Sequence, residues 1–224
     1  MITDSPFLMT EWYRRETWTK TDEEEFFTKL RRAWKDSRAQ YLKIQAITLI
    51  GTKKKRYLSA AETLLNQVLN DFPEDRVQKS QTYLSLGTIY ELNGDDAKAL
   101  EFYKKSMDFE KEFPNVQTGS YLSYAETAIR TSRTDLYPAI EQKLLSEINA
   151  DGLQFPYSNY LTYSFLAAIA AHDGRIAVAK RYADLAESNA VATNNTLWNP
   201  RKRKLGIVNR RIVWLDDLVK NGSS

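Results

Sequence analysis

Apolar residues recur at helical spacing through most of the chain. Between residues 78 and 113 they form two stretches, separated by the turn sequence Asn-Gly-Asp-Asp at 93–96. Gly94 suits the left-handed backbone that ends a helix, and Asp95 suits the cap of the next one. The pattern therefore predicts a helical hairpin over residues 76–113. Its apolar positions are Tyr83, Leu86, Ile89, Tyr90, Ala97, Leu100, Phe102, Tyr103 and Met107.

The dipeptide Phe-Pro recurs along this pattern. Pro73, Pro114 and Pro156 follow one another after 41 and 42 residues, and Pro200 comes 44 residues later. Proline cannot continue a helix, so each Phe-Pro predicts the end of one hairpin and the start of the next. Shifts of 80 and 38 residues bring further copies of the apolar pattern into register. We expect hairpins over residues 37–72, 76–113, 116–150 and 157–192, the first with a long connection at 51–57.

The two ends of the chain are expected to cover this array with capping helices over residues 22–35 and 202–220. Thr21 and Glu24 have the spacing of a capping box at the first of them. Residues 1–20 are interpreted as an extended arm, residues 21–220 as one repeat domain, and residues 221–224 as a disordered tail. The apolar faces expected on the two capping helices are Phe26, Phe27, Leu30 and Trp34, and Leu205, Val208, Ile212, Leu215 and Val219.

The hairpin at 76–113 resembles the tetratricopeptide repeat (TPR) family, a family of helical repeats. The resemblance implies an all-α fold, a right-handed superhelix (α-solenoid) of about four TPR-like hairpins with a capping helix at each end. In such a fold Gly87 and Ala99 are small because the paired helices cross there at close range. Pro114 comes later than the family would place it. The residues that match the family pattern are Tyr83, Leu86, Gly87, Tyr90, Ala99, Tyr103 and Ser106.

The resemblance also implies a concave groove that binds a protein or peptide. The family's clamp for C-terminal carboxylates needs Lys and Asn in this groove, where Leu84 and Thr88 stand, so that ligand is disfavoured. Glu126 and Arg130 are alternatively a simple i,i+4 pair, and Phe165 alternatively belongs to the core. The partner-binding positions expected in the groove are Gln81, Ser85, Thr88, Glu91, Ser123, Glu126, Arg130, Ser164, Phe165 and His172.

Composition narrows the chemistry. The 224 residues include no Cys and one His, which excludes thiol nucleophiles, Cys-ligated zinc sites and two-histidine metalloprotease motifs. No apolar run is long enough to span a membrane, and the formal net charge is only +3. We expect no catalytic residue, no cofactor and no metal.

The function expected from these observations is that of a cytoplasmic, bacterial, non-catalytic scaffold. It would neutralise or regulate a partner protein, as a toxin's immunity protein does. The alternative is a nucleic-acid or phosphate-binding repeat protein that uses the basic runs 53–56 and 201–204.

Overall fold

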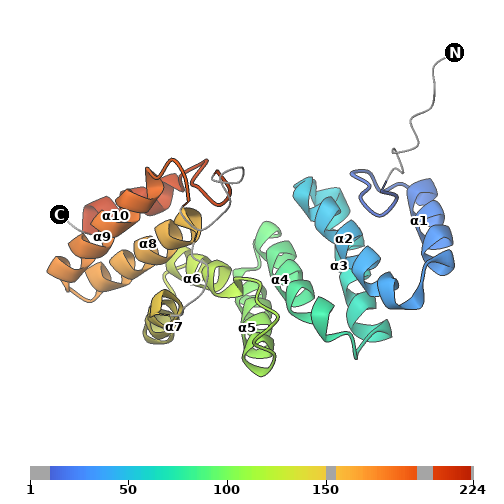
Figure 1. Cartoon of the computed structure of the whole chain (residues 1–224), viewed down its shortest axis with the longest axis horizontal. Coiled ribbons are helices and arrows are strands. Elements are labelled where there is room, and N and C mark those ends of the chain that lie inside the picture. The colour runs from blue at the N-terminus through green and yellow to red at the C-terminus, as the bar shows by residue number, and fades with distance from the viewer. Residues whose placement is uncertain (1–10, 150–154, 196–203, 223–224) are drawn as a thin grey trace, which may run out of the picture. The chain divides into compact units, whose positions relative to one another are not determined.

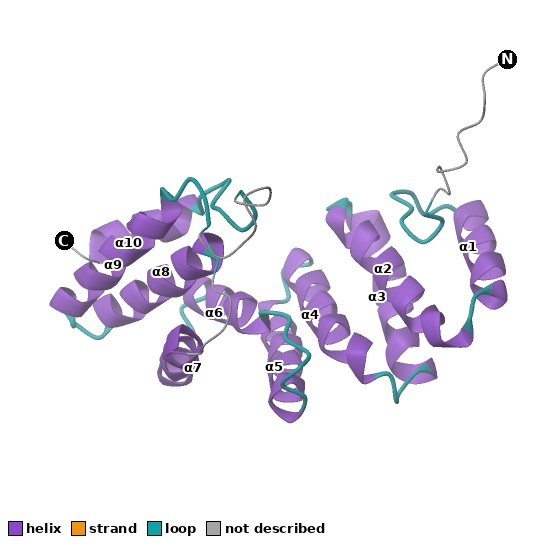
Figure 2. Cartoon of the chain, in the orientation of Figure 1, coloured by secondary structure: helices purple, strands orange, loops and turns teal. Residues whose placement is uncertain are grey.

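The computed structural model describes residues 11–149, 155–195 and 204–222. These residues contain ten α-helices and no β-strand, which confirms the prediction of an all-α chain (Figure 1). Figure 2 shows the helices joined by turns and loops, with an irregular segment before α10. The chain divides into two compact units, residues 1–120 and 121–224, and each is described by itself.

Unit 1 is built from helices that pack on their neighbours in sequence. α2 packs against α3, and α4 packs against α5. α4 also contacts both α2 and α3, so each helix pair lies against the next. A continuous apolar core results, to which α1 contributes Phe26 and Leu30. The helices are α1 (Lys20–Arg32), α2 (Arg38–Gly51), α3 (Lys55–Asp71), α4 (Arg76–Leu92) and α5 (Asp96–Glu112), with a 3-10 turn at Lys35–Ser37.

α4 and α5 approach closely at Gly87. A Cβ atom at this position would lie 2.5 Å from Cδ1 of Tyr103, so only glycine leaves room for the ring. Tyr103 is fully buried, and its hydroxyl donates a hydrogen bond to Oε2 of Glu91 at 2.7 Å. The close crossing expected at Gly87 is therefore filled by an aromatic ring of the partner helix.

The turns of unit 1 follow local sequence signals. Gly94 has a φ of +82°, and the side chain of Asp95 accepts a hydrogen bond from the main-chain N–H of Lys98, as predicted. α3 and α5 each end one residue before a Phe-Pro. The connection at 51–57 is shorter than expected, because α3 already begins at Lys55 and Lys53 makes the turn with a φ of +56°.

The first helix begins earlier than the sequence pattern suggested. The capping box is formed by Thr19 and Asp22, so the proposed pair at Thr21 and Glu24 was wrong. Because α1 ends at Arg32, Trp34 lies beyond the helix and is 85 % exposed instead of joining the apolar face. The shifted cap leaves the expected residues Phe26 and Leu30 in the core.

A buried carboxylate holds the connection between α5 and the next helix. Glu110 is only 4 % exposed, and its Oε1 accepts hydrogen bonds from the Ser80 hydroxyl at 2.9 Å and the Thr118 main-chain N–H at 3.0 Å. The hydroxyls of Thr118 and Ser120 donate to the same oxygen. Ser106 completes the cluster by donating to the main-chain oxygen of Ser80. The hydroxyls and the carboxylate of this cluster thus satisfy one another's hydrogen bonds within the protein.

Unit 2 is organised around α8, which is apolar on nearly every side. α8 contacts α7, α9 and α10, so few of its positions reach water. Pro156 is the first residue of α8, where its missing N–H costs no hydrogen bond. Pro200 lies outside the described residues. The helices are α6 (Ser120–Arg130), α7 (Tyr137–Asn149), α8 (Pro156–His172), α9 (Ile176–Ala190) and α10 (Val213–Gly222), with a 3-10 turn at Thr134–Leu136.

The last helix is shorter than predicted. α10 begins at Val213, and residues 204–212 are irregular because their main chain binds the start of α8. The Tyr157 N–H donates to the Gly206 oxygen at 2.8 Å, and the Ile212 N–H donates to the Tyr160 hydroxyl at 3.1 Å. Of the expected face, Leu215 and Val219 are buried, whereas Leu205 is 51 % exposed.

Candidate functional site

The candidate residues on α4 divide between its surface and its interior. Gln81, Thr88 and Glu91 are partly exposed, as a binding surface requires. Ser85 is only 4 % exposed and belongs to the buried side of α4, which corrects its assignment as a groove residue. Glu91 is already engaged by the Tyr103 hydroxyl, so its orientation is set by the α4–α5 packing.

α2 adds two surface positions that the sequence reasoning missed. Lys43 is partly buried, and burial lowers the pKa of its ammonium group, an effect that the negative charge of Asp75 partly offsets. Ile47 is 38 % exposed. The sequence could have indicated both positions, because the 41-residue spacing of the first two Phe-Pro dipeptides aligns Lys43 with Leu84 and Ile47 with Thr88. Since α2 contacts α4, these two helices contribute to one surface of unit 1, here called the α2–α4 surface.

The candidate residues on α6 lie at the surface of unit 2. Ser123 and Glu126 are partly exposed, and Arg130 is exposed at the end of the helix. The negative charge of Glu126 also acts on Tyr157, whose pKa is raised mainly by burial and secondarily by that charge. Both charged side chains of α6 thus reach the surface of unit 2.

The candidate residues on α8 are largely internal. Phe165 is fully buried and Ser164 is 1 % exposed, so neither can contact a partner at the surface. The alternative, in which Phe165 belongs to the core, is correct, because α8 is covered by α7, α9 and α10. His172 remains exposed, with its ring edge-on to Tyr137 at 5.1 Å between centroids.

A polar network joins α10 to α8 and α9. The Tyr160 hydroxyl donates to Asp216 at 2.9 Å, and burial together with that carboxylate raises the pKa of Tyr160 to about 12. Arg211 bridges Asp216 and Glu187. Beside this network lies a hollow of about 940 Å³ that the sequence did not predict, lined by Tyr157, Gly206, Ile207, Asn209, Arg210, Arg211, Ile212, Val213, Trp214 and Asp217.

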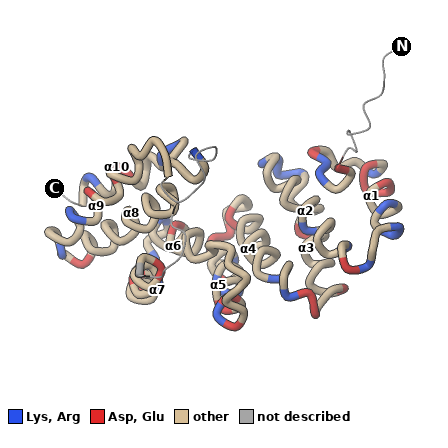
Figure 3. Tube along the Cα trace, viewed as in Figure 1, with Lys and Arg blue, Asp and Glu red and all other residues tan. Residues whose placement is uncertain are grey.

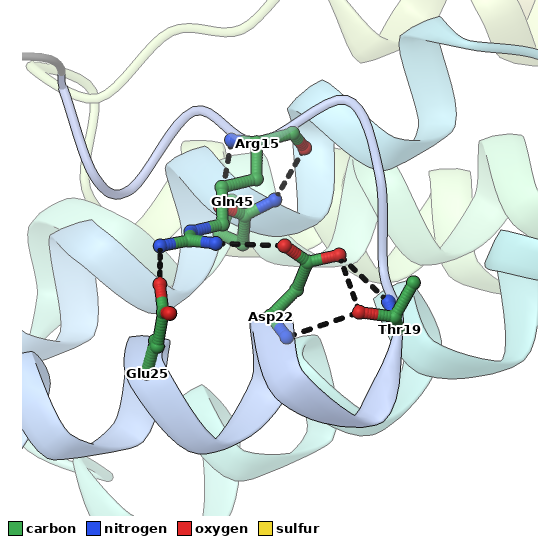
Figure 4. Close-up of polar contacts among 5 residues, drawn as sticks. All are labelled: Arg15, Thr19, Asp22, Glu25 and Gln45. Atoms are coloured by element: carbon green, nitrogen blue, oxygen red, sulfur yellow. Dashed lines mark hydrogen bonds and ion pairs between the residues drawn. The ribbon is translucent and has the colours of Figure 1, made fainter.

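Residues 11–18 lie on α1 and α2 as a non-helical segment, here called the N-terminal strap, which begins with a turn in which the Arg14 N–H donates to the Glu11 oxygen. Figure 4 shows the side chain of Gln45 facing the main chain of Arg15, and the Arg15 guanidinium between two carboxylates. Its nitrogens lie 2.7 Å from Asp22 and 2.5 Å from Glu25. Asp22 also accepts hydrogen bonds from the main-chain N–H and the hydroxyl of Thr19. One carboxylate therefore caps α1 and binds the strap at the same time.

Asp22 makes the strap region sensitive to acid. The Thr19 main-chain N–H, followed by the Thr19 hydroxyl and Arg15, lowers the pKa of Asp22 to about 2 against the effect of burial. A carboxylate with a depressed native pKa stabilises the fold above its unfolded-state pKa, and this stability is lost as the pH falls through the native value. We expect the stability advantage of the wild type over Asp22→Asn to fall to about half near pH 3. Urea unfolding of both proteins at pH 6 and pH 3 measures this, and an unchanged difference would contradict it.

The first basic run lies at the turn between α2 and α3. Lys53, Lys54, Lys55 and Arg56 are all exposed, and the first turn of α3 holds no acidic residue (Figure 3, end of α2). The Arg56 guanidinium lies 4.8 Å from the Tyr57 ring centroid. The second run falls on residues 201–203, outside the described part of the chain, and on Lys204, which is exposed.

Residues 11–149, 155–195 and 204–222 hold no group of three His, Cys, Asp or Glu side chains that could bind a metal ion. Within the same ranges, no helix combines the length and the apolar character that crossing a membrane requires. Comparison with known proteins found no matching family model, no significantly similar curated protein and no significantly similar solved structure.

Proposed function

We propose that this chain is a non-catalytic scaffold that binds a segment of a partner protein. The observation that carries the proposal is the packing of α4 on both α2 and α3 in unit 1. This is the stacking that the TPR resemblance implies, in which the first helices of successive hairpins line a binding groove. The superhelix of about four hairpins is part of the proposal.

The composition of the α2–α4 surface supports this function. It offers an exposed apolar side chain in Ile47, a partly buried cation in Lys43, and polar groups in Gln81, Thr88 and Glu91. A surface that mixes apolar and polar groups in this way is typical of protein interfaces. Neutralisation of a partner, as by an immunity protein, is one role that such a scaffold would perform.

The groove proposal can be tested at Arg130 and Glu126 of α6. We expect the combined change Arg130→Glu and Glu126→Lys to weaken capture of the natural partner by at least about tenfold, or roughly 1.4 kcal/mol. The fold should survive, because surface pairs contribute only a few tenths of a kcal/mol. The partner is first identified by co-purification, and its affinity is then measured by calorimetry for both proteins.

A photo-crosslinking amino acid places the partner independently of affinity. Introduced at Thr88 it should form the crosslink, whereas introduced at Lys104 on the exposed side of α5 it should not. Equal crosslinking at both positions would contradict binding at the α2–α4 surface.

A second candidate function rests on the exposed run Lys53–Arg56. Four cations at one turn would make binding to nucleic acid or phosphate steeply salt-dependent. Reversal of these four charges is therefore the matched control for the α6 change. If it abolishes capture of the partner while the α6 change has no effect, the partner binds the basic run and the groove proposal is wrong.

A further inference from the structure

The N-terminal strap is held to the rest of unit 1 in the way a separate peptide would be. Gln45 is fully buried, and its amide is paired by the strap: the Arg15 N–H donates to its Oε1 at 2.9 Å, and its Nε2 donates to the Arg15 oxygen at 2.7 Å. A buried amide needs such partners. One glutamine thus pairs both main-chain groups of a single strap residue.

The side chain of the same strap residue adds charge recognition. The Arg15 guanidinium faces both Asp22 and Glu25, so the site carries two negative charges for one positive charge. The neighbouring Arg14 forms its ion pair with Glu11, inside the strap itself. The site therefore distinguishes two adjacent arginines by position.

Aromatic rings supply the apolar part of the contact. Tyr13 stacks on Tyr41 of α2 with 4.6 Å between ring centroids, and Trp12 lies 5.0 Å from Tyr41 and 5.3 Å from Phe26. Within the described residues, the main chain of the strap makes no hydrogen bond to the main chain of α1 or α2. The hydrogen bonds, ion pairs and ring contacts of the strap described above could therefore also be made by a segment that is not covalently connected to α1.

We infer that α1 and α2 form a binding site for a segment in which a turn with two aromatic residues precedes an arginine, and that the strap fills this site in cis. A partner protein carrying an arginine after aromatic residues takes the place of the strap. The covalent connection contributes a high effective concentration and no contact of its own. This site is separate from the α2–α4 surface and does not depend on the proposed function.

Occupancy by the strap reduces the affinity that an external peptide shows. An external peptide binds only those molecules whose site is open, so its apparent affinity is the intrinsic affinity multiplied by the open fraction. Weakening the strap raises this fraction and should therefore strengthen external binding. Arg15→Ala removes the two ion pairs that Arg15 forms with α1, while Gln45, Asp22 and Glu25 stay in place. If Arg15 had only a structural role, Arg15→Ala would instead weaken binding of the external peptide.

The experiment uses the full chain and a fluorescent peptide with the sequence of residues 11–18. We expect Arg15→Ala to bind the peptide at least tenfold more tightly than the wild type, measured by fluorescence anisotropy at equal helicity. The peptide carrying Arg15→Ala should lose this binding, and the peptide carrying Arg14→Ala should keep it. Adding Glu25→Gln to the Arg15→Ala chain should weaken binding.

Two results would overturn the inference. The first is equal or weaker peptide binding by the Arg15→Ala chain. The second is equal loss of binding by the Arg14 and Arg15 peptide variants, which would indicate unspecific attraction. Hydrogen exchange of the wild type gives a second measurement: millimolar peptide should accelerate exchange of the Arg15 N–H that Gln45 binds, and an unchanged rate would also contradict the inference.

Discussion

Replacement of Gly87 by leucine should destabilise unit 1 by roughly 1–3 kcal/mol, the usual cost of overpacking a core. Even the Cβ atom of the new residue would lie 2.5 Å from Cδ1 of Tyr103. Because Tyr103 is fully buried, its ring cannot move into solvent without opening the core. Displacing the ring would also break its hydrogen bond to Glu91.

Gly51 provides the matched control. It also lies in a helix, but a Cβ atom there would meet nothing within 4 Å, so Gly51→Leu should leave the stability nearly unchanged. Urea unfolding followed by circular dichroism compares the two variants with the wild type. The double variant Gly87→Leu and Tyr103→Ala should cost less than the sum of its parts, since the clash is removed. Equal free energies of unfolding for Gly87→Leu and the wild type would mean that the α4–α5 crossing lies elsewhere.

Replacement of Glu110 by alanine should destabilise unit 1 by about 2–4 kcal/mol. Hydrogen bonds to a charged group are worth about 1.5–3 kcal/mol, and donors left unsatisfied in the interior add to the loss. The donors in question are the hydroxyls of Ser80, Thr118 and Ser120 and the main-chain N–H of Thr118. Residues 118–120 should lose protection from hydrogen exchange first, because Glu110 holds them in place.

Two further variants separate the contributions at this cluster. Glu110→Gln keeps the volume and a neutral acceptor, so it should cost less than Glu110→Ala. Glu112→Ala changes an exposed residue at the end of the same helix and should remain within about 0.5 kcal/mol of the wild type. If Glu110→Ala is as stable as Glu112→Ala, the cluster does not hold the connection to α6.

The candidate site was only partly predictable from the sequence. The apolar period identified α4 and its outward positions, and Gln81, Thr88 and Glu91 do reach the surface. The same period failed for Ser85, because α2 and α3 both pack on α4 and cover more than one side of it. It failed for Phe165 for the same reason, since α8 has neighbours on several sides.

What the sequence determined by itself is the helical class and the turn at Gly94 and Asp95. These depend on residues a few positions apart, because helix hydrogen bonds and caps join near neighbours. The tertiary structure alone decided which helix faces are covered, the pairing of Gln45 with Arg15, and the cluster around Glu110. Those contacts join residues up to 30 positions apart, and the chain must first be packed before a side chain can find such a partner.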